Sequence, residues 1–292
     1  MAEDSSLISL PNDDVYLHLF SDIHLEFSPK QEFSLPPPRQ SGIHFALLPG
    51  DIGHPTKPEY KQFLERTRKD YDHVIVSIGN HEYYARQGSH HTPVDIVLQT
   101  ARRIAKETDC ILLERDTFTF EHHEQRVTFL GCTLWSDIEN FYYEAKQGLN
   151  DFRNIYIGET APHGRENTSD FLTPAMYHDW HKRDVAWLQQ EIETRKEPLI
   201  ILTHHCPSKE IISPAYRNHP LNPCFSSNLD HLFTNNIKLW VCGHSHRPMQ
   251  TYINNIPCGL NPRGYPGETQ DFKPMSYSLF KGGVLKLIPH TF

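Results

Sequence analysis

The stretch "VYLHLFSDIH", residues 15–24, is an apolar run that ends in an acid and an imidazole two positions apart. Its first six residues predict a buried strand. Asp22 and His24 then stand at the carboxyl end of that strand. Because side chains alternate along a strand, we expect both to point to the same side, where they can bind one cation.

The elements around this strand predict an α/β chain built from two mixed β-sheets. Strand, crossover, strand, helix and strand follow one another, the order typical of a largely parallel sheet covered by helices. Residues 110–135 are rich in β-formers broken by polar turn residues, which favours antiparallel strands and hence a second sheet. The other strands are expected at 43–51, 73–80, 198–205 and 238–246, and the helices at 58–70, 95–108 and 178–197.

Length, charge and cysteine usage limit the class of protein. The chain has 292 residues, 28 of them basic and 36 acidic, and a net charge of -8, so no general basic surface would attract nucleic acid or a membrane. We expect one domain over residues 1–292, with a substrate-facing loop insertion around 136–178. The sequence shows no signal peptide or long apolar run, and its six cysteines lack CxxC spacing, which favours a cytoplasmic protein with reduced thiols.

Four further strand ends carry polar side chains like those of the first. They read "PGDIG", "SIGNHE", "ILTHHCP" and "VCGHSH", and they bring the number of candidate metal ligands to seven. One ion with an open position does not need seven ligands, so two ions are expected. Imidazole, carboxylate and amide together suit Mn, Fe or Zn better than Ca or Mg. The candidates are Asp22, His24, Asp51, Asn80, His244, His246 and one of the adjacent His204 and His205.

These ordered motifs, D-x-H, G-D, G-N-H-E, a later H and G-H-x-H, resemble those of the calcineurin-like metallophosphoesterase family. The likeness runs from Phe20 to about His246. Three other segments, "TLWSD", "LNDFR" and "NPRGYPGE", resemble parts of a bacterial-type branch of that family. The resemblance implies two facing β-sheets flanked by helices in four layers.

The resemblance also implies roles for the ligands. One metal would be held by Asp22, His24 and His246. The other would be held by Asn80, His244 and a histidine of "THH", with Asp51 bridging the two ions. Family members often show His-x-Pro at the "THH" position, and Pro207 follows His205 by two, so His205 is preferred and His204 stays open as the alternative.

A phosphate-ester hydrolase is therefore the leading hypothesis. The resemblance implies attack by a hydroxide that bridges the metals, with His81 giving a proton to the leaving group and Glu82 in a structural part. Arg153, in "LNDFR", is a candidate for substrate binding because a guanidinium can hold two phosphate oxygens. A phosphoester, either a small molecule or part of a macromolecule, would be the partner. The alternatives are a nuclease, which the acidic balance disfavours, and a non-catalytic scaffold on the same fold.

Overall fold

Two six-stranded β-sheets form the centre of the molecule. The computed structural model describes residues 14–28, 32–84, 91–158, 170–269 and 272–290. The first sheet has the order β12 (Val284–Pro289), β11 (Met275–Lys281), β1 (Val15–Leu19), β2 (Ile43–Pro49), β3 (His73–Ser77), β4 (Ile111–Leu113). The second has the order β5 (Asp116–His122), β6 (Gln125–Cys132), β7 (Leu199–Thr203), β8 (Ile237–Cys242), β10 (Ile256–Leu260), β9 (Met249–Ile253).

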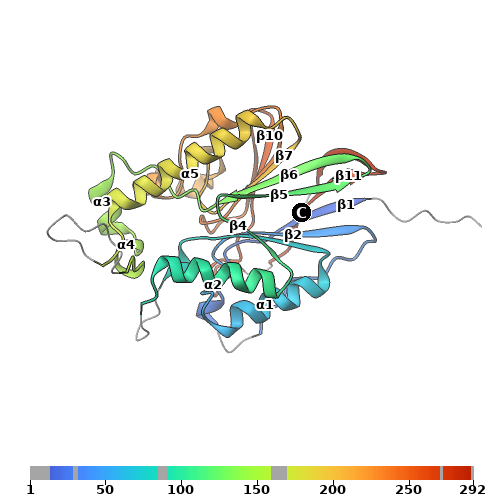
Figure 1. The fold of residues 1–292 in the computed structure, drawn as a ribbon. Helices are drawn as coiled ribbons and strands as arrows, with labels where there is room; N and C mark the ends of the chain where they lie inside the picture. The colour runs from blue at the N-terminus through green and yellow to red at the C-terminus, as the bar shows by residue number, and fades with distance from the viewer. Residues whose placement is uncertain (1–13, 29–31, 85–90, 159–169, 270–271, 291–292) are drawn as a thin grey trace, which may run out of the picture.

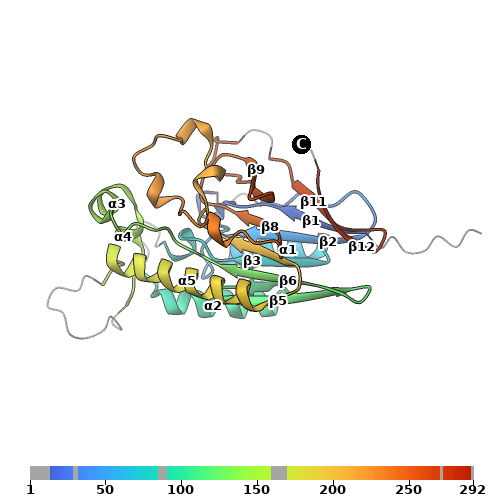
Figure 2. The ribbon, with the colours of Figure 1, turned by 90° about the horizontal axis from the view of Figure 1, so that it is seen from above.

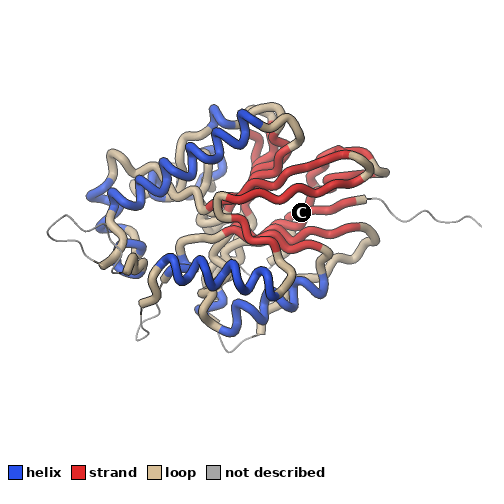
Figure 3. Tube along the Cα trace, viewed as in Figure 1, coloured by secondary structure: helices blue, strands red, loops and turns tan. Residues whose placement is uncertain are grey.

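Helices cover the outer face of each sheet. The helices are α1 (Pro58–Asp70), α2 (Val94–Glu107), α3 (Tyr142–Gly148), α4 (Asp151–Asn154) and α5 (Pro174–Thr194). Figure 1 shows α1 and α2 on the outer side of the first sheet and α5 on that of the second. Figure 3 shows the same four layers, with the strands in red between helices in blue. The expected fold class, two mixed sheets flanked by helices, is confirmed.

The central strands β1, β2, β3, β7 and β8 are almost entirely buried because each sheet is covered on both sides. The space between the sheets is filled by side chains such as Leu17 and Phe45 from the first sheet and Phe129 and Val241 from the second. Within the first sheet β1, β2, β3 and β4 are parallel, and within the second β6, β7, β8 and β10 are parallel. The carboxyl ends of these parallel strands hold the loops of the candidate site.

The helices follow their apolar spacing, with two differences from the sequence-based expectation. Helix α5 begins at Pro174, four residues before the expected 178, because the Thr173 side chain accepts a hydrogen bond from Met176 N and caps the helix. The 136–178 segment contains α3 and α4, although its sequence shows little periodicity; residues 159–169 of it lie outside the described part. Figures 1 and 2 both place α3 and α4 beside the start of α5.

No helix among the described residues is long and apolar enough to cross a membrane.

A buried histidine in β1 is expected to make folding stability depend on pH. His18 is 6% exposed, its Nδ1 lies 2.8 Å from Ser276 Oγ and its Nε2 lies 3.0 Å from His44 Nδ1. Burial, together with His44 and His290, lowers the pKa of His18 to about 3. The unfolded chain therefore binds more protons than the folded one between about pH 6.5 and pH 3, and stability is lost as the pH falls through that window.

The test is the free energy of unfolding from urea titrations at pH 7.5, 6 and 5. The wild type should lose up to about 1.4 kcal/mol per pH unit more than His18→Gln, which cannot take up the proton. Equal pH slopes in the two proteins would contradict the assignment.

Candidate metal centre

The backbone turns sharply where the strands of the site end. Asp22, His24, Asp51 and His244 have φ angles of 51°, 52°, 54° and 70°, in the left-handed region. Residues other than glycine adopt this conformation at a cost of about 1 to 2 kcal/mol, and such residues gather at functional sites. Strand alternation therefore ends before these residues, and their directions follow from the turns.

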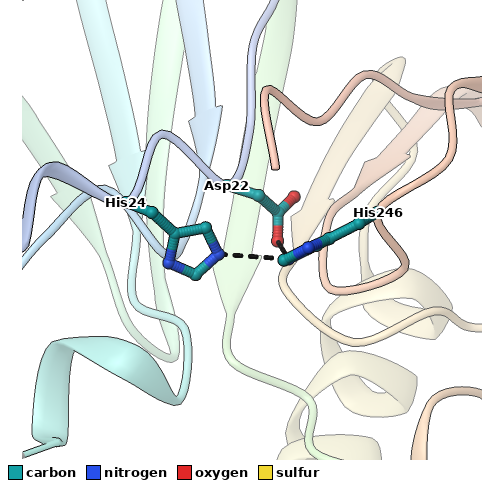
Figure 4. A group of neighbouring side chains, drawn as sticks. All are labelled: Asp22, His24 and His246. Atoms are coloured by element: carbon teal, nitrogen blue, oxygen red, sulfur yellow. Dashed lines mark hydrogen bonds and ion pairs between the residues drawn. The ribbon is translucent and has the colours of Figure 1, made fainter. Parts of the chain in front are cut away.

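The first group of ligand candidates is Asp22, His24 and His246. Figure 4 shows the two imidazoles pointing toward each other beside the carboxylate. His24 Nε2 lies 3.1 Å from His246 Nε2, which lies 3.6 Å from Asp22 Oδ1. These three are the residues expected to share one metal.

The second group contains Asp51, His204 and His244. His204 Nε2 lies 3.3 Å from Asp51 Oδ2 and 3.0 Å from Asn80 Oδ1. The two histidines of "GHSH" thus belong to different groups, although strand alternation alone would have pointed them to one ion. His244 has a positive φ of 70°, so the regular alternation of a strand does not extend through this motif.

Asp51 lies between the two groups. Its Oδ2 is 3.3 Å from His204 Nε2 in the second group and 3.8 Å from His24 Nε2 in the first. Its Oδ1 accepts a hydrogen bond from His81 N at 2.8 Å. Burial acts to raise the pKa of this carboxyl, but His204, His81 and His24 outweigh it and hold the pKa well below its usual range. One carboxylate oxygen thus faces both groups.

The structure places His204, and not His205, in the second group. His205 Nε2 instead lies 3.1 Å from the hydroxyl of Tyr177, and the centroid of its ring is 5.5 Å from that of the Trp135 ring. Strand β7 ends at Thr203, so the preference for His205, which rested on alternation and on the spacing to Pro207, does not fit this geometry. His204 replaces it in our ligand set.

Oxygen atoms hold three of the imidazoles in orientation. His24 Nδ1 lies 2.8 Å from Glu26 Oε1, His246 Nδ1 lies 2.8 Å from Glu268 Oε2, and His204 Nδ1 lies 2.9 Å from the carbonyl oxygen of Pro49. A Nδ1–H that donates to oxygen leaves Nε2 as the nitrogen that faces the centre and can bind a metal, as in metal sites generally.

Two buried ligand atoms have no hydrogen-bond partner among the described residues: Asp22 Oδ2 and His244 Nε2. Burial lowers the pKa of His244 to about 3, so its imidazole is neutral and can offer a lone pair. Buried polar atoms are costly to leave unpaired. The unpaired atoms and the mixed nitrogen and oxygen donors fit transition-metal ions.

The segment 261–264 holds the loop that carries Asp22. Ser21 N donates to Asn261 O at 2.9 Å, and Gly264 N donates to Asp22 O at 3.0 Å. The side-chain amide of Asn261 donates to Leu19 O at 2.7 Å. These bonds fix the direction of the first ligand from a part of the chain far away in sequence.

Glu82 fixes the loop of Asp51 in the same way. Its carboxylate accepts hydrogen bonds from the backbone of Asp51, Ile52 and Gly79 at 2.7 to 3.0 Å. A Cβ at Gly79 would collide with Asp51 Oδ1, so only glycine allows this close approach. The interactions agree with the structural part expected for Glu82.

The ring of His81 lies beside the first group, with its centroid 4.5 Å from that of His24, and both of its nitrogens are within hydrogen-bond distance of an oxygen. Its Nδ1 is 3.1 Å from Glu26 Oε1 and its Nε2 is 3.2 Å from the hydroxyl of Tyr265. The ring stacks on that of Tyr84 with centroids 4.2 Å apart. Burial opposes its charge, but Asp51 and Glu26 raise the pKa of His81 above the usual value, so the protonated form is favoured.

A pocket of about 320 Å³ opens over both groups. Its wall includes Asp51, Asn80, His81, Tyr84, Gly148, Leu149, Asn150, Asp151, Ile212, Tyr216, His219, Asn222, Phe225, His244, Ser245, His246 and Tyr265. Arg153 is not among them: its side chain is exposed and Nη2 donates to Gln147 O at 3.1 Å. On α4, Asp151 faces the pocket and Arg153 does not, so the structure does not support Arg153 as a substrate contact.

Comparison with known proteins gives the family. The family model for calcineurin-like phosphoesterases matches residues 16–248. The chain belongs to the calcineurin-like phosphoesterase family. It is therefore a hydrolytic enzyme that cleaves phosphoesters with the help of metal, and the family resemblance in its motifs is confirmed.

Individual relatives extend over most of the chain. An uncharacterized protein of Acanthamoeba polyphaga mimivirus is 27% identical over 282 residues, which cover 89% of this chain and 95% of the relative. Phosphopantetheinyl hydrolase from Mycobacterium tuberculosis has a similar fold, with a TM-score of 0.66, 18% identity, and coverage of 88% of this chain and 92% of that one. A putative 5′-nucleotidase from Staphylococcus aureus matches with a TM-score of 0.50, 12% identity, and coverage of 95% and 53%.

Several residues of this phosphoesterase site do not stand out in the sequence. Glu26 follows His24 by two positions, but only the structure shows that it contacts both His24 and His81. Asp151 and Tyr265 lie in the "LNDFR" and "NPRGYPGE" segments. The family likeness pointed to these two segments but assigned no role to either residue. Phe225 has no motif around it and stacks on His244 with centroids 4.7 Å apart.

The adjacent histidines give a test of the ligand set. His204→Asn should lower the bound metal of the Mn-loaded protein by about one ion per chain, because Nε2 of His204 faces Asp51 and Asn80. His205→Asn is the matched control and should keep both ions. Metal is counted by elemental analysis after desalting. Loss of an ion from the His205 variant alone would restore the original preference.

Proposed function

We propose that this enzyme hydrolyses small phosphate mono- or diesters at a dinuclear centre of Mn, Fe or Zn. One ion is bound by Asp22, His24 and His246, the other by Asn80, His204 and His244. The observation that carries the proposal is Asp51 Oδ2, which lies within 3.8 Å of a ligand nitrogen in each group. Sharing of one carboxylate is the arrangement by which two ions act on one phosphoryl group.

The protein residues have separate tasks in this reaction. When bound, the two ions polarise a phosphoryl oxygen and lower the pKa of the attacking water. Glu26, Glu268 and the Pro49 carbonyl hold the ligand imidazoles in place, which keeps the geometry ready before substrate binds. Most of the ligand side chains are buried, which strengthens the electrostatic interactions among them.

His81 is the proposed proton donor to the leaving group. Its Nδ1 is directed at Glu26 Oε1, which leaves Nε2 directed at the pocket. Nε2 already has an oxygen, the hydroxyl of Tyr265, at hydrogen-bond distance, so an alcohol oxygen of a substrate can take a similar position. The proton therefore passes from Nε2 to the departing alkoxide.

The pocket favours a small substrate over nucleic acid. No residue of its described wall is a lysine or arginine, whereas nucleases need cations along the path of the backbone. The segment 136–178 contributes residues 148–151 to the wall, in agreement with a substrate-facing insertion in a single domain. A scaffold would not need a histidine with both nitrogens held beside the ligand groups.

The proposal is tested with purified protein loaded with Mn, Fe or Zn. We expect hydrolysis of 4-nitrophenyl phosphate or bis(4-nitrophenyl) phosphate, and two ions per chain by elemental analysis. The ratio of the two rates shows the preference for mono- or diesters. A protein that binds two ions and cleaves neither ester nor any member of a phosphoester panel would contradict the proposal.

A further inference from the structure

Asp151 has a buried carboxylate oxygen without a hydrogen-bond partner among the described residues. The residue is 2% exposed, and it is Oδ1 that is unpaired. The other oxygen, Oδ2, accepts a hydrogen bond from the hydroxyl of Tyr84 at 2.9 Å. Burial raises the pKa of Asp151, which shows that the carboxylate lies in a poor environment for charge. A buried acceptor left in this way costs free energy unless a ligand pairs with it.

The carboxylate lies in the wall of the pocket over the metal groups. It is two hydrogen bonds away from a proposed ligand, because Asn80 Nδ2 donates to the hydroxyl of Tyr84 at 3.1 Å. Through this chain Tyr84 also turns the Asn80 amide so that Oδ1 faces His204. A phosphate held by the centre would therefore have Asp151 within reach of its alcohol part.

The rest of the wall indicates which group would pair with Asp151. Leu149, Ile212 and Phe225 are apolar, and no lysine or arginine contributes to the described wall. A second phosphate or a carboxylate on the substrate would meet Asp151 as a like charge in a partly buried site. A hydroxyl or an ammonium group would instead donate to the free oxygen.

We propose that Asp151 is a substrate-binding residue that accepts a hydrogen bond from a hydroxyl or ammonium group on the alcohol part of the substrate. The inference rests on the proposed function and names its substrate class: phosphate esters of amino alcohols or polyols. The pocket selects them over esters of plain alcohols and over bisphosphates.

The experiment measures binding, so that it does not depend on turnover. Three phosphonates that the enzyme cannot hydrolyse are titrated into Mn-loaded protein by calorimetry: propylphosphonate, 3-hydroxypropylphosphonate and 3-aminopropylphosphonate. We expect the amino compound to bind about 10 to 100 times more tightly than the propyl compound, and the hydroxyl compound to lie between them.

Variants assign the preference to Asp151. Asp151→Asn removes the charge at nearly constant size and should bring the amino and propyl affinities to within about threefold. Asp151→Ala should remove the preference for both donors. Glu144→Gln, at an exposed carboxylate on α3, is the matched control and should keep the wild-type order.

The outcomes separate this inference from the proposed function. Equal affinities of the wild type for all three phosphonates, or a preference that survives in both Asp151 variants, would overturn the inference and leave hydrolysis untouched. A preference for the amino or hydroxyl phosphonate that depends on Asp151, in a protein without hydrolytic activity, would support the inference and contradict the proposed function. Binding of none of the phosphonates would count against both.

Discussion

Asp51→Asn is expected to abolish phosphoester hydrolysis. One oxygen of this carboxylate faces both ligand groups, at 3.3 and 3.8 Å from their imidazole nitrogens. An amide of the same size keeps one neutral oxygen and loses the charge that balances two cations. We expect kcat to fall by roughly 1,000-fold or more, about 4 kcal/mol of activation free energy, and the bound metal to fall from two ions to one or fewer.

Activity and metal content are measured on the same preparation. The control is Asp70→Asn, which makes the same change at an exposed position at the end of α1 and should keep both ions and full activity. A variant of Asp51 that retains two ions and more than a tenth of the wild-type rate would show that the two groups do not depend on a shared carboxylate.

Replacement of His81 by glutamine should have the second largest effect, and the size of the effect should depend on the leaving group. An alkyl phosphate needs a proton on the departing oxygen, so kcat should fall by roughly 100- to 10,000-fold. 4-Nitrophenolate leaves readily without a proton, so the loss with 4-nitrophenyl phosphate should be at least ten times smaller. The comparison of kcat for the two esters is the measurement.

The same substitution at a second histidine serves as the control for this test. His91→Gln alters an exposed ring that is not part of the described pocket wall and should leave both rates unchanged. An equal loss with both esters in the His81 variant would show that His81 positions the substrate or the loop of Asn80 and does not donate the proton.

Most of the fold could be predicted from periodicity. The parallel strands and the helices α1 and α2 follow from apolar runs and helical spacing, and the Pro58 start of α1 agrees with its expected first turn. Apolar spacing does not show the hydrogen bond by which Thr173 caps α5, so the start predicted from the sequence, residue 178, lies four residues after the observed one. Helices α3 and α4 are short and depend on packing, which a sequence pattern does not show.

The motifs named most of the side chains that lie together in the candidate site, but spacing alone did not show how these side chains divide into two groups. Alternation holds within a strand, yet the ligands follow the strands, in left-handed turns stabilised by distant residues such as Glu82 and Gly264. His204 and His205 likewise follow the end of β7 at Thr203, so alternation does not decide which of them joins Asp51. The contacts of Glu26, Asp151 and Tyr265 depend on loops that meet only in the folded chain.

The hydrogen bonds from segment 261–264 to the loop of Asp22 determine when the centre can form during synthesis. Strand β1 is translated before the other strands of the two sheets, but it lies between β2 and β11, and the direction of Asp22 depends on Asn261 and Gly264. Some 240 residues must be translated before that loop has its partners. Until segment 261–264 has been translated, the nascent chain therefore carries a loop of Asp22 that lacks these hydrogen bonds, and a fully ordered centre forms only after that point.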